Sequence, residues 1–264
     1  MSTLGEERST NPLLKIQDEE EFLKWFPGTF AAVPSYYPRM RPINRAGPRL
    51  RRDIPPPPQL SPEEFDGLRQ SALVVDVRPL HEYSAGHIPN ALSVTFRDVY
   101  PIWLGWLVPE GATILFVLGD APVEQVIDQS QLVGYEGFGG WLAGGMAAWE
   151  ASGRPVRQMQ LLDAPQARRA LADGALALDV RQPPELDSGY IDGAVNLPLG
   201  KIESQVEMLP KDRPILAYCG HGERSATALS LLERAGFSQL LNLNGGVGAW
   251  SEAGYNLASP VGVQ

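Results

Sequence analysis

The chain contains the same series of short segments twice, and this internal repeat limits its fold more than any other feature. Ala-Leu-Val-Val-Asp-Val-Arg at 72–78 returns as Ala-Leu-Ala-Leu-Asp-Val-Arg at 175–181. Gly-Gly-Met-Ala-Ala-Trp at 144–149 likewise returns as Gly-Gly-Val-Gly-Ala-Trp at 245–250. A period of about a hundred residues with order and spacing preserved indicates a duplicated domain and excludes a short solenoid repeat.

Each repeat predicts helices alternating with buried strands. A helix-capping signal opens both repeats, at Ser61-Pro-Glu-Glu64 and at Asp163-Ala-Pro-Gln166. Short apolar runs without alternation follow, at 73–77 and 175–180, and such runs are typical of strands buried on both faces. We therefore expect an α/β fold with two domains, each a mostly parallel sheet flanked by helices.

The N-terminal region differs in composition from both repeats. Residues 18–26 predict a short helix, whereas 27–58 are rich in proline and arginine and predict an extended arm. We divide the chain into an arm at 1–59, a first repeat at 60–157 and a second repeat at 158–264. The basic residues Arg49, Arg51 and Arg52 are interpreted as lying on an acidic body, with an exposed basic patch as the alternative.

Charge and cysteine content narrow the function classes. The net charge is -9 and the pI about 4.9, which argues against nucleic-acid and membrane-surface partners. The single cysteine excludes an intramolecular disulfide and fits a reducing compartment. Three scattered histidines argue against a structural metal site. With no basic segment leading into an apolar run at the N-terminus, and no long apolar stretch, we expect a cytoplasmic protein.

The single cysteine, Cys219, lies where an apolar strand is followed by a helix. The segment Tyr-Cys-Gly-His-Gly-Glu-Arg-Ser at 218–225 forms the loop between them, and ligands of open α/β sheets bind at such positions. The helix dipole and the unpaired N–H groups of the first turn would stabilise a thiolate. Gly220 and Gly222 allow the backbone to curl into an anion cradle, and Arg224 can close it. The other loop residues expected to contact substrate are His221, Glu223 and Ser225.

Together these motifs resemble the rhodanese family. Both repeats carry Asp-Val-Arg, a glutamate four residues after that arginine, a Gly-x-Ile turn and the terminal Gly-Gly-x-x-x-Trp, and the resemblance covers roughly 60–260. It implies that Cys219 is the nucleophile that forms a persulfide and that 220–224 bind the sulfur. The loop of six residues resembles the sulfur-handling type; related phosphatases have a loop one residue longer. No cofactor or metal is expected.

Three further residues of the second repeat are predicted to support the loop. Asp179 and Arg181 are expected to form an ion pair, with Glu185 as a possible third member. Glu223 is unexpected beside an anion site, because its carboxylate would weaken binding of a dianion unless it points outward. This feature favours a persulfide as donor.

The first repeat departs from the second at the nucleophile. Leu118 stands in the place of Cys219, Val123 in the place of Arg224, and Asp120 would repel an anion. The first repeat is therefore predicted to be catalytically silent, and to pack against the second and shape the entrance to its loop.

The arm also resembles the connector between a metallo-β-lactamase-fold persulfide dioxygenase and tandem rhodaneses in natural fusions. The residues that carry this resemblance lie at 22–27 and 37–48. The metal-binding His-x-His-x-Asp-His pattern is not present in the sequence. Two interpretations stay open: a piece of such a fusion, or a separate protein that has a dioxygenase of this kind as its partner.

Three functions remain for this chain. The first is a sulfurtransferase that moves sulfur from thiosulfate or a small persulfide to a thiol, sulfite or cyanide acceptor. The second is a carrier that passes the Cys219 persulfide to a partner protein. The third is an arsenate reductase or phosphatase on the same fold, which the loop length disfavours.

Overall fold

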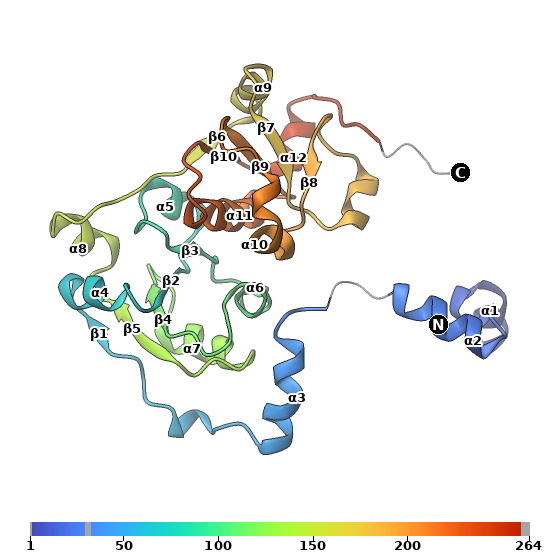
Figure 1. Cartoon of the computed structure of the whole chain (residues 1–264), viewed down its shortest axis with the longest axis horizontal. Helices are drawn as coiled ribbons and strands as arrows, with labels where there is room; N and C mark the ends of the chain where they lie inside the picture. Colours follow the sequence, from blue (N-terminus) through green and yellow to red (C-terminus); the bar gives the residue numbers. More distant parts are fainter. Residues whose placement is uncertain (1, 30–32, 260–264) are drawn as a thin grey trace.

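The computed structural model describes residues 2–29 and 33–259, and it confirms two α/β domains with parallel sheets (Figure 1). The first sheet has the strand order β1-β5-β4-β2-β3 and the second the order β6-β10-β9-β7-β8. Every pairing between these strands is parallel. In each sheet the repeated Asp-Val-Arg strand pairs with the strand that leads into the Cys219 or Leu118 loop. Because the two strands are parallel, the end of the Asp-Val-Arg segment and the loop lie together at the carboxyl ends of the strands.

The elements of the first repeat follow the predicted alternation. Its strands and helices, in chain order, are β1 (Gln59–Leu60), α4 (Pro62–Leu68), β2 (Leu73–Asp76), α5 (Leu80–Ala85), β3 (Leu92–Ser93), α6 (Tyr100–Leu107), β4 (Ile114–Val117), α7 (Val123–Gln131), β5 (Phe138–Leu142) and α8 (Gly145–Ala151). The predicted capping box forms, since the Ser61 hydroxyl accepts the Glu64 N–H and the Glu64 carboxylate accepts the Ser61 N–H.

The second repeat has the same order, with a 3-10 helix, η4 (Pro183–Ser188), where the first has α5. Its remaining elements are β6 (Gln160–Leu162), α9 (Ala164–Ala172), β7 (Leu176–Asp179), β8 (Val195–Asn196), η5 (Leu199–Lys201), α10 (Ile202–Gln205), η6 (Val206–Met208), β9 (Ile215–Tyr218), α11 (Glu223–Arg234), β10 (Leu240–Leu243) and α12 (Gly246–Glu252). The capping box at Asp163 and Gln166 is also present. Helix α11 is the longest of these and follows the Cys219 loop directly.

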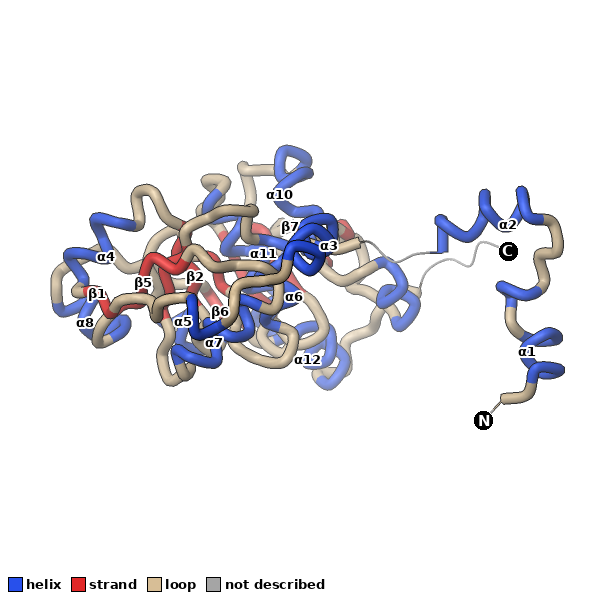
Figure 2. Tube along the Cα trace, turned by 90° about the horizontal axis from the view of Figure 1, so that it is seen from below, coloured by secondary structure: helices blue, strands red, loops and turns tan. Residues whose placement is uncertain are grey.

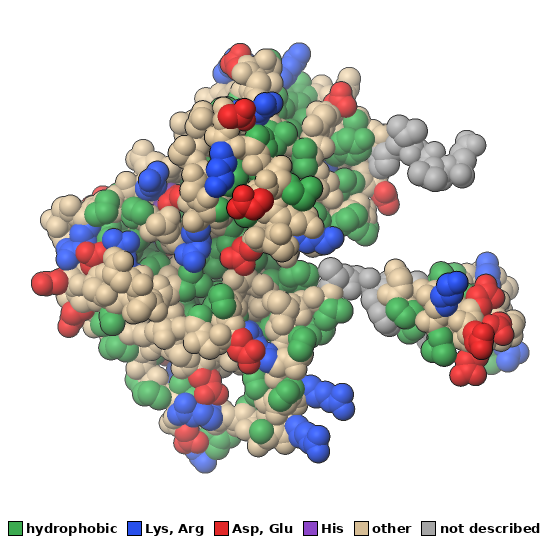
Figure 3. Space-filling view, in the orientation of Figure 1, with side chains coloured by type: hydrophobic (Ala, Val, Ile, Leu, Met, Phe, Trp, Pro, Cys, Tyr) green, Lys and Arg blue, Asp and Glu red, His purple; other side chains and the backbone are tan. Residues whose placement is uncertain are grey.

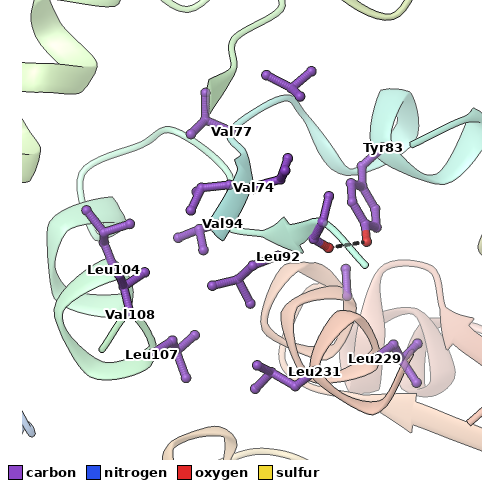
Figure 4. Close-up of a cluster of buried hydrophobic side chains, with 14 of the residues drawn as sticks. Val74, Val77, Tyr83, Leu92, Val94, Leu104, Leu107, Val108, Leu229 and Leu231 are labelled. Atoms are coloured by element: carbon purple, nitrogen blue, oxygen red, sulfur yellow. Dashed lines mark hydrogen bonds between the residues drawn. The ribbon is translucent and has the colours of Figure 1, made fainter. Parts of the chain in front are cut away.

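The two repeats share one hydrophobic core, and α11 lies at its centre. All residues from Ser225 to Leu232 are buried, between the second sheet and the edge of the first. Figure 4 shows Tyr83 and Leu92 of the first repeat beside α11, from which Leu229 and Leu231 project. Burial of each such leucine contributes about 1.5–3 kcal/mol. A second, smaller cluster covers the opposite face of the second sheet, under α9 and α12.

The arm is helical where an extended chain was expected, so that prediction is wrong for Tyr37–Ala46, which forms α3. Proline disfavours a helix interior, but α3 packs on the first repeat. The space beside Gly134 is occupied by Ile43 Cδ1, and Arg39 donates from Nη2 to the Val133 carbonyl at 2.8 Å. Tertiary contacts thus stabilise a helix that composition alone disfavours.

Two of the three arginines at 49–52 lie on acidic residues of the first repeat, as interpreted from the sequence. Arg49 pairs with Glu136 at 3.3 Å and Arg51 with Asp128 at 2.6 Å. Arg52 approaches only its neighbour Asp53, at 3.8 Å.

Two further helices precede α3. The predicted helix near the N-terminus is present as α2 (Glu19–Trp25), and α1 (Leu4–Thr10) comes before it. Neither has a buried residue, and Figures 1 and 2 show both apart from the two domains. Figure 3 shows acidic side chains on this segment, which carries glutamates in the first turn of each helix.

Candidate active site

Cys219 follows the last residue of β9 and is 2 % exposed. The backbone N–H of Gly222 donates to its Sγ, with the nitrogen 3.1 Å from the sulfur. Gly222 has a φ of 104°, in the region that favours glycine, and this turn directs its N–H at the sulfur. An N–H at the start of a helix stabilises negative charge on the atom it faces, so the turn places a donor where charge on the sulfur would lie.

Asn242 on β10 holds the loop in this shape, although it is not among the residues predicted from the sequence motifs. Its Nδ2 donates to the Gly222 carbonyl at 2.9 Å, and its Oδ1 lies 2.6 Å from the Ser225 hydroxyl. Ser225 Oγ is 3.8 Å from Cys219 Sγ. A hydroxyl has one proton, and the shorter contact with Asn242 takes it. The available signal was a fully buried amide within the apolar strand Leu240–Leu243.

The Gly-Gly pair at the start of α12 allows that helix to pack directly on the loop. A methyl group added to Gly246 would lie 2.3 Å from the Cys219 carbonyl oxygen, so only glycine fits. The Val247 N–H donates to the same oxygen at 2.8 Å. In the second repeat, the Gly-Gly-x-x-x-Trp motif therefore keeps the Cys219 loop compact.

Arg224, expected to close the cradle, is held by Glu185. Its two terminal nitrogens each donate to one oxygen of the Glu185 carboxylate at 2.7 Å. The hydrogen bond from Arg224 lowers the pKa of Glu185, and the same bond raises the pKa of Arg224. A forked contact of this kind fixes the plane of the guanidinium at the mouth of the loop.

Asp179 and Arg181 form the predicted ion pair, and both are buried. Arg181 Nη2 lies 2.6 Å from Asp179 Oδ2 and also donates to the Gly189 carbonyl at 2.8 Å. The Glu185 carboxylate was a possible third member, but it binds Arg224, and Arg181 reaches only the Glu185 main-chain carbonyl, at 3.3 Å. The pair connects β7 to η4, and so positions Glu185.

Glu223 points away from the sulfur, toward the first repeat. Arg97 Nη2 lies 2.8 Å from its Oε2. Leu80 of the first repeat also borders the loop, since a methyl group added to Gly222 would lie 3.2 Å from its Cδ2. His221, the residue before Gly222, is exposed.

The corresponding loop of the first repeat has neither nucleophile nor cradle. Leu118 follows β4 as Cys219 follows β9, and Val123 begins α7. The Ala121 N–H donates to the Leu118 carbonyl at 3.1 Å and thus forms an ordinary turn. The backbone of this loop is not arranged to stabilise an anion at residue 118.

Two negative observations apply to residues 2–29 and 33–259. No three His, Cys, Asp or Glu side chains gather there in a way that could hold a metal ion. No helix in this part of the chain has the length and apolar character needed to span a bilayer.

Comparison with known proteins confirms the resemblance noted from the motifs. The model of the rhodanese-like domain matches twice, at residues 61–152 and 163–253. The chain belongs to the rhodanese family. Both matches lie within the two α/β domains, so this is a tandem rhodanese whose single cysteine lies in the second domain.

Several relatives of this rhodanese are named as sulfurtransferases. A sulfurtransferase of Allochromatium vinosum is 37% identical over 95 residues, which are 36% of this chain and 89% of that protein. The thiosulfate sulfurtransferase GlpE of Pseudomonas entomophila is 33% identical over 85 residues, 32% of this chain and 78% of that protein. The probable adenylyltransferase/sulfurtransferase MoeZ of Mycobacterium tuberculosis is 40% identical over 125 residues, and the match covers 47% of this chain and only 31% of that protein.

Solved structures of rhodaneses are also similar to this chain. A rhodanese-related protein of Thermoplasma volcanium aligns with 29% identity and a TM-score of 0.36, covering 38% of this chain and 99% of that one. Thiosulfate sulfurtransferase of Pseudomonas aeruginosa covers 76% of this chain and 43% of its own, with 18% identity and a TM-score of 0.34. Residues 1–60 lie outside both family matches, so the likeness of the arm to dioxygenase fusions stays a prediction.

Proposed function

We propose that this protein is a sulfurtransferase and that Cys219 carries the sulfur as a persulfide. The observation that carries the proposal is the Gly222 N–H directed at Cys219 Sγ at 3.1 Å, at the start of α11. Family membership and the named sulfurtransferases among the relatives support the same activity.

In the first half-reaction the Cys219 thiolate attacks the outer sulfur of thiosulfate or of a small persulfide. The new Cys219 S–S bond forms as the donor S–S bond breaks, and sulfite or a thiolate leaves with the electron pair. The loop N–H groups and the Arg224 guanidinium stabilise the negative charge of the terminal sulfur. In the second half-reaction a thiol, sulfite or cyanide attacks that sulfur and releases the Cys219 thiolate.

The contact of Glu223 with Arg97 bears on the choice of donor. A free carboxylate beside the cradle would disfavour a dianion, but this one is paired at 2.8 Å and faces the first repeat. The electrostatic reason to prefer a persulfide over thiosulfate is therefore weakened. We propose both as donors, to be separated by rate.

The test is intact-protein mass spectrometry of the wild type and of Cys219→Ser after separate exposure to thiosulfate and to glutathione persulfide. We expect a gain of one sulfur atom on the wild type only. No gain with either donor would overturn the proposal, and hydrolysis of a phosphate ester or reduction of arsenate by the wild type would then identify the third function.

A carrier role is distinguished by the second half-reaction. Loaded wild-type protein is mixed with glutathione, cyanide or a purified metallo-β-lactamase-fold persulfide dioxygenase. Fast loss of sulfur to the small acceptors supports the enzyme. Retention with all small acceptors, together with loss to the dioxygenase, would replace it with the carrier.

A further inference from the structure

The first repeat has a cavity of about 510 Å³ at the place where the second repeat has its catalytic loop. The charged and large apolar side chains that line it include Arg78, Glu82, Asp120, Val123, Trp141 and Met146. Pockets for small ligands occupy roughly 300–1,000 Å³, so the volume suits a ligand. Nothing in the proposed sulfur transfer uses this cavity.

The cavity is open because α8 does not pack on the loop as α12 does. A methyl group added to Gly145 would meet no atom within 4 Å, whereas one added to the equivalent Gly246 would lie 2.3 Å from the Cys219 carbonyl. The first repeat, which has a leucine in place of the cysteine, thus has an open cavity where helix α12 packs against the loop in the second repeat.

The charge of the cavity is opposite to that of the cradle. Glu82 corresponds to Glu185, but Val123 stands where Arg224 would bind it. Within residues 2–29 and 33–259, neither the Glu82 carboxylate nor that of Asp120 makes a hydrogen bond or ion pair to a side chain. Arg78 does not neutralise them, because its guanidinium is bound to Asp76 through contacts of 2.6–3.1 Å.

The second repeat shows which group a glutamate at this position binds. Glu185 holds a guanidinium in a forked contact with both distances at 2.7 Å. Glu82 has lost that guanidinium and faces the cavity, where its Oε2 would be 3.3 Å from a methyl group added to Gly119. Trp141 supplies an aromatic surface in the same cavity, and guanidinium groups stack on such surfaces.

From this comparison of the two repeats, we infer that the cavity of the first repeat binds a guanidinium from outside the domain, in the place of the missing arginine side chain. The guanidinium belongs either to a small molecule or to an arginine of a peptide or protein. Glu82 accepts its forked hydrogen bonds, Asp120 adds a second negative charge, and Trp141 covers its face.

The test is calorimetric titration of the full chain with methylguanidine, with an acetyl-Gly-Arg-Gly amide peptide and with the matching lysine peptide. The variants are Glu82→Gln, Val123→Arg and, as the matched control, Glu124→Gln, which removes an exposed charge from the next position on α7. We expect binding of the guanidinium probes, weakened about tenfold or more in Glu82→Gln, because a charge-assisted forked contact is lost.

Val123→Arg supplies an internal guanidinium to Glu82 as Arg224 does to Glu185, so it should abolish binding without unfolding the domain. Tighter binding of the arginine peptide than of methylguanidine would identify a protein side chain as the source, and equal binding a small molecule. The inference is overturned by absence of binding, by equal affinity for the lysine peptide, by equal loss in Glu124→Gln, or by full binding in Val123→Arg.

Discussion

Arg97 of the first repeat binds Glu223 in the Cys219 loop of the second, with Nη2 2.8 Å from Oε2. The two residues lie on different domains, and Glu223 is the first residue of α11 and follows Gly222, whose N–H faces the sulfur. The first repeat therefore contributes a charge to the edge of the Cys219 loop, in addition to packing against helix α11.

Replacing Arg97 by glutamine should raise the KM for thiosulfate about two- to fivefold, because the released Glu223 carboxylate repels the dianion and exposed pairs of this kind contribute up to about 1 kcal/mol. Steady-state kinetics at low ionic strength measure the change, which high salt should reduce. Arg97→Lys is the matched control, and Arg97→Gln with Glu223→Gln should restore the KM. A double variant as impaired as Arg97→Gln would contradict this explanation.

Glu233 anchors α11 to the first repeat and makes stability depend on pH. Its carboxylate accepts the Asn90 N–H at 2.8 Å and contacts His87 Nε2 at 3.0 Å. Burial raises the pKa of Glu233, but the hydrogen bonds from His87 and Asn90 outweigh it and hold the pKa below its usual value. Because the folded-state pKa is the lower one, this stabilisation is present above the unfolded-state pKa of about 4.3 and is lost as the pH falls through the folded-state value.

Glu233→Gln should therefore lower the free energy of unfolding near neutral pH by about 1–3 kcal/mol, since it leaves a buried donor without its charged acceptor. The difference from the wild type should diminish as the pH falls below about 4. Urea unfolding at several pH values measures both effects, with the exposed Glu252→Gln as control. A constant difference across the acid range would show that the carboxylate charge is not the cause.

Asp179 and Arg181 form a buried ion pair, and removal of one member should destabilise the fold more than removal of both. Arg181→Met leaves the Asp179 carboxylate buried without its partner and should cost about 3–5 kcal/mol. Asp179→Leu combined with Arg181→Met removes both charges and should cost less than Arg181→Met alone. Urea unfolding of the three proteins gives the comparison, and a double variant less stable than the single one would contradict it.

A cysteine placed at Leu118 should not acquire the activity of Cys219. In Leu118→Cys with Cys219→Ser the thiol would follow β4, but the Ala121 N–H is bound to the carbonyl of residue 118 and Val123 offers no charge. We expect persulfide formation about a hundredfold slower than in the wild type, the scale of losing one oriented N–H donor. Mass spectrometry after timed exposure to thiosulfate measures it; loading at the wild-type rate would mean that the cradle is unnecessary.

The sequence by itself determined the features that depend on neighbouring residues. The repeated motifs established two α/β domains, the capping boxes placed α4 and α9, and the apolar run followed by Cys219 and two glycines located the loop. These features were predictable because strand burial, helix capping and glycine turns are each set within a few residues of chain.

Only the tertiary structure decided which distant residues meet. It paired Glu185 with Arg224, turned Glu223 toward Arg97, and placed Asn242 under the loop. It also made α3 helical despite its prolines and left the cavity beside Glu82 open. The physical reason is the same throughout: a local pattern states which groups a segment carries, whereas the partner of a charge or an amide depends on packing between elements far apart in the chain.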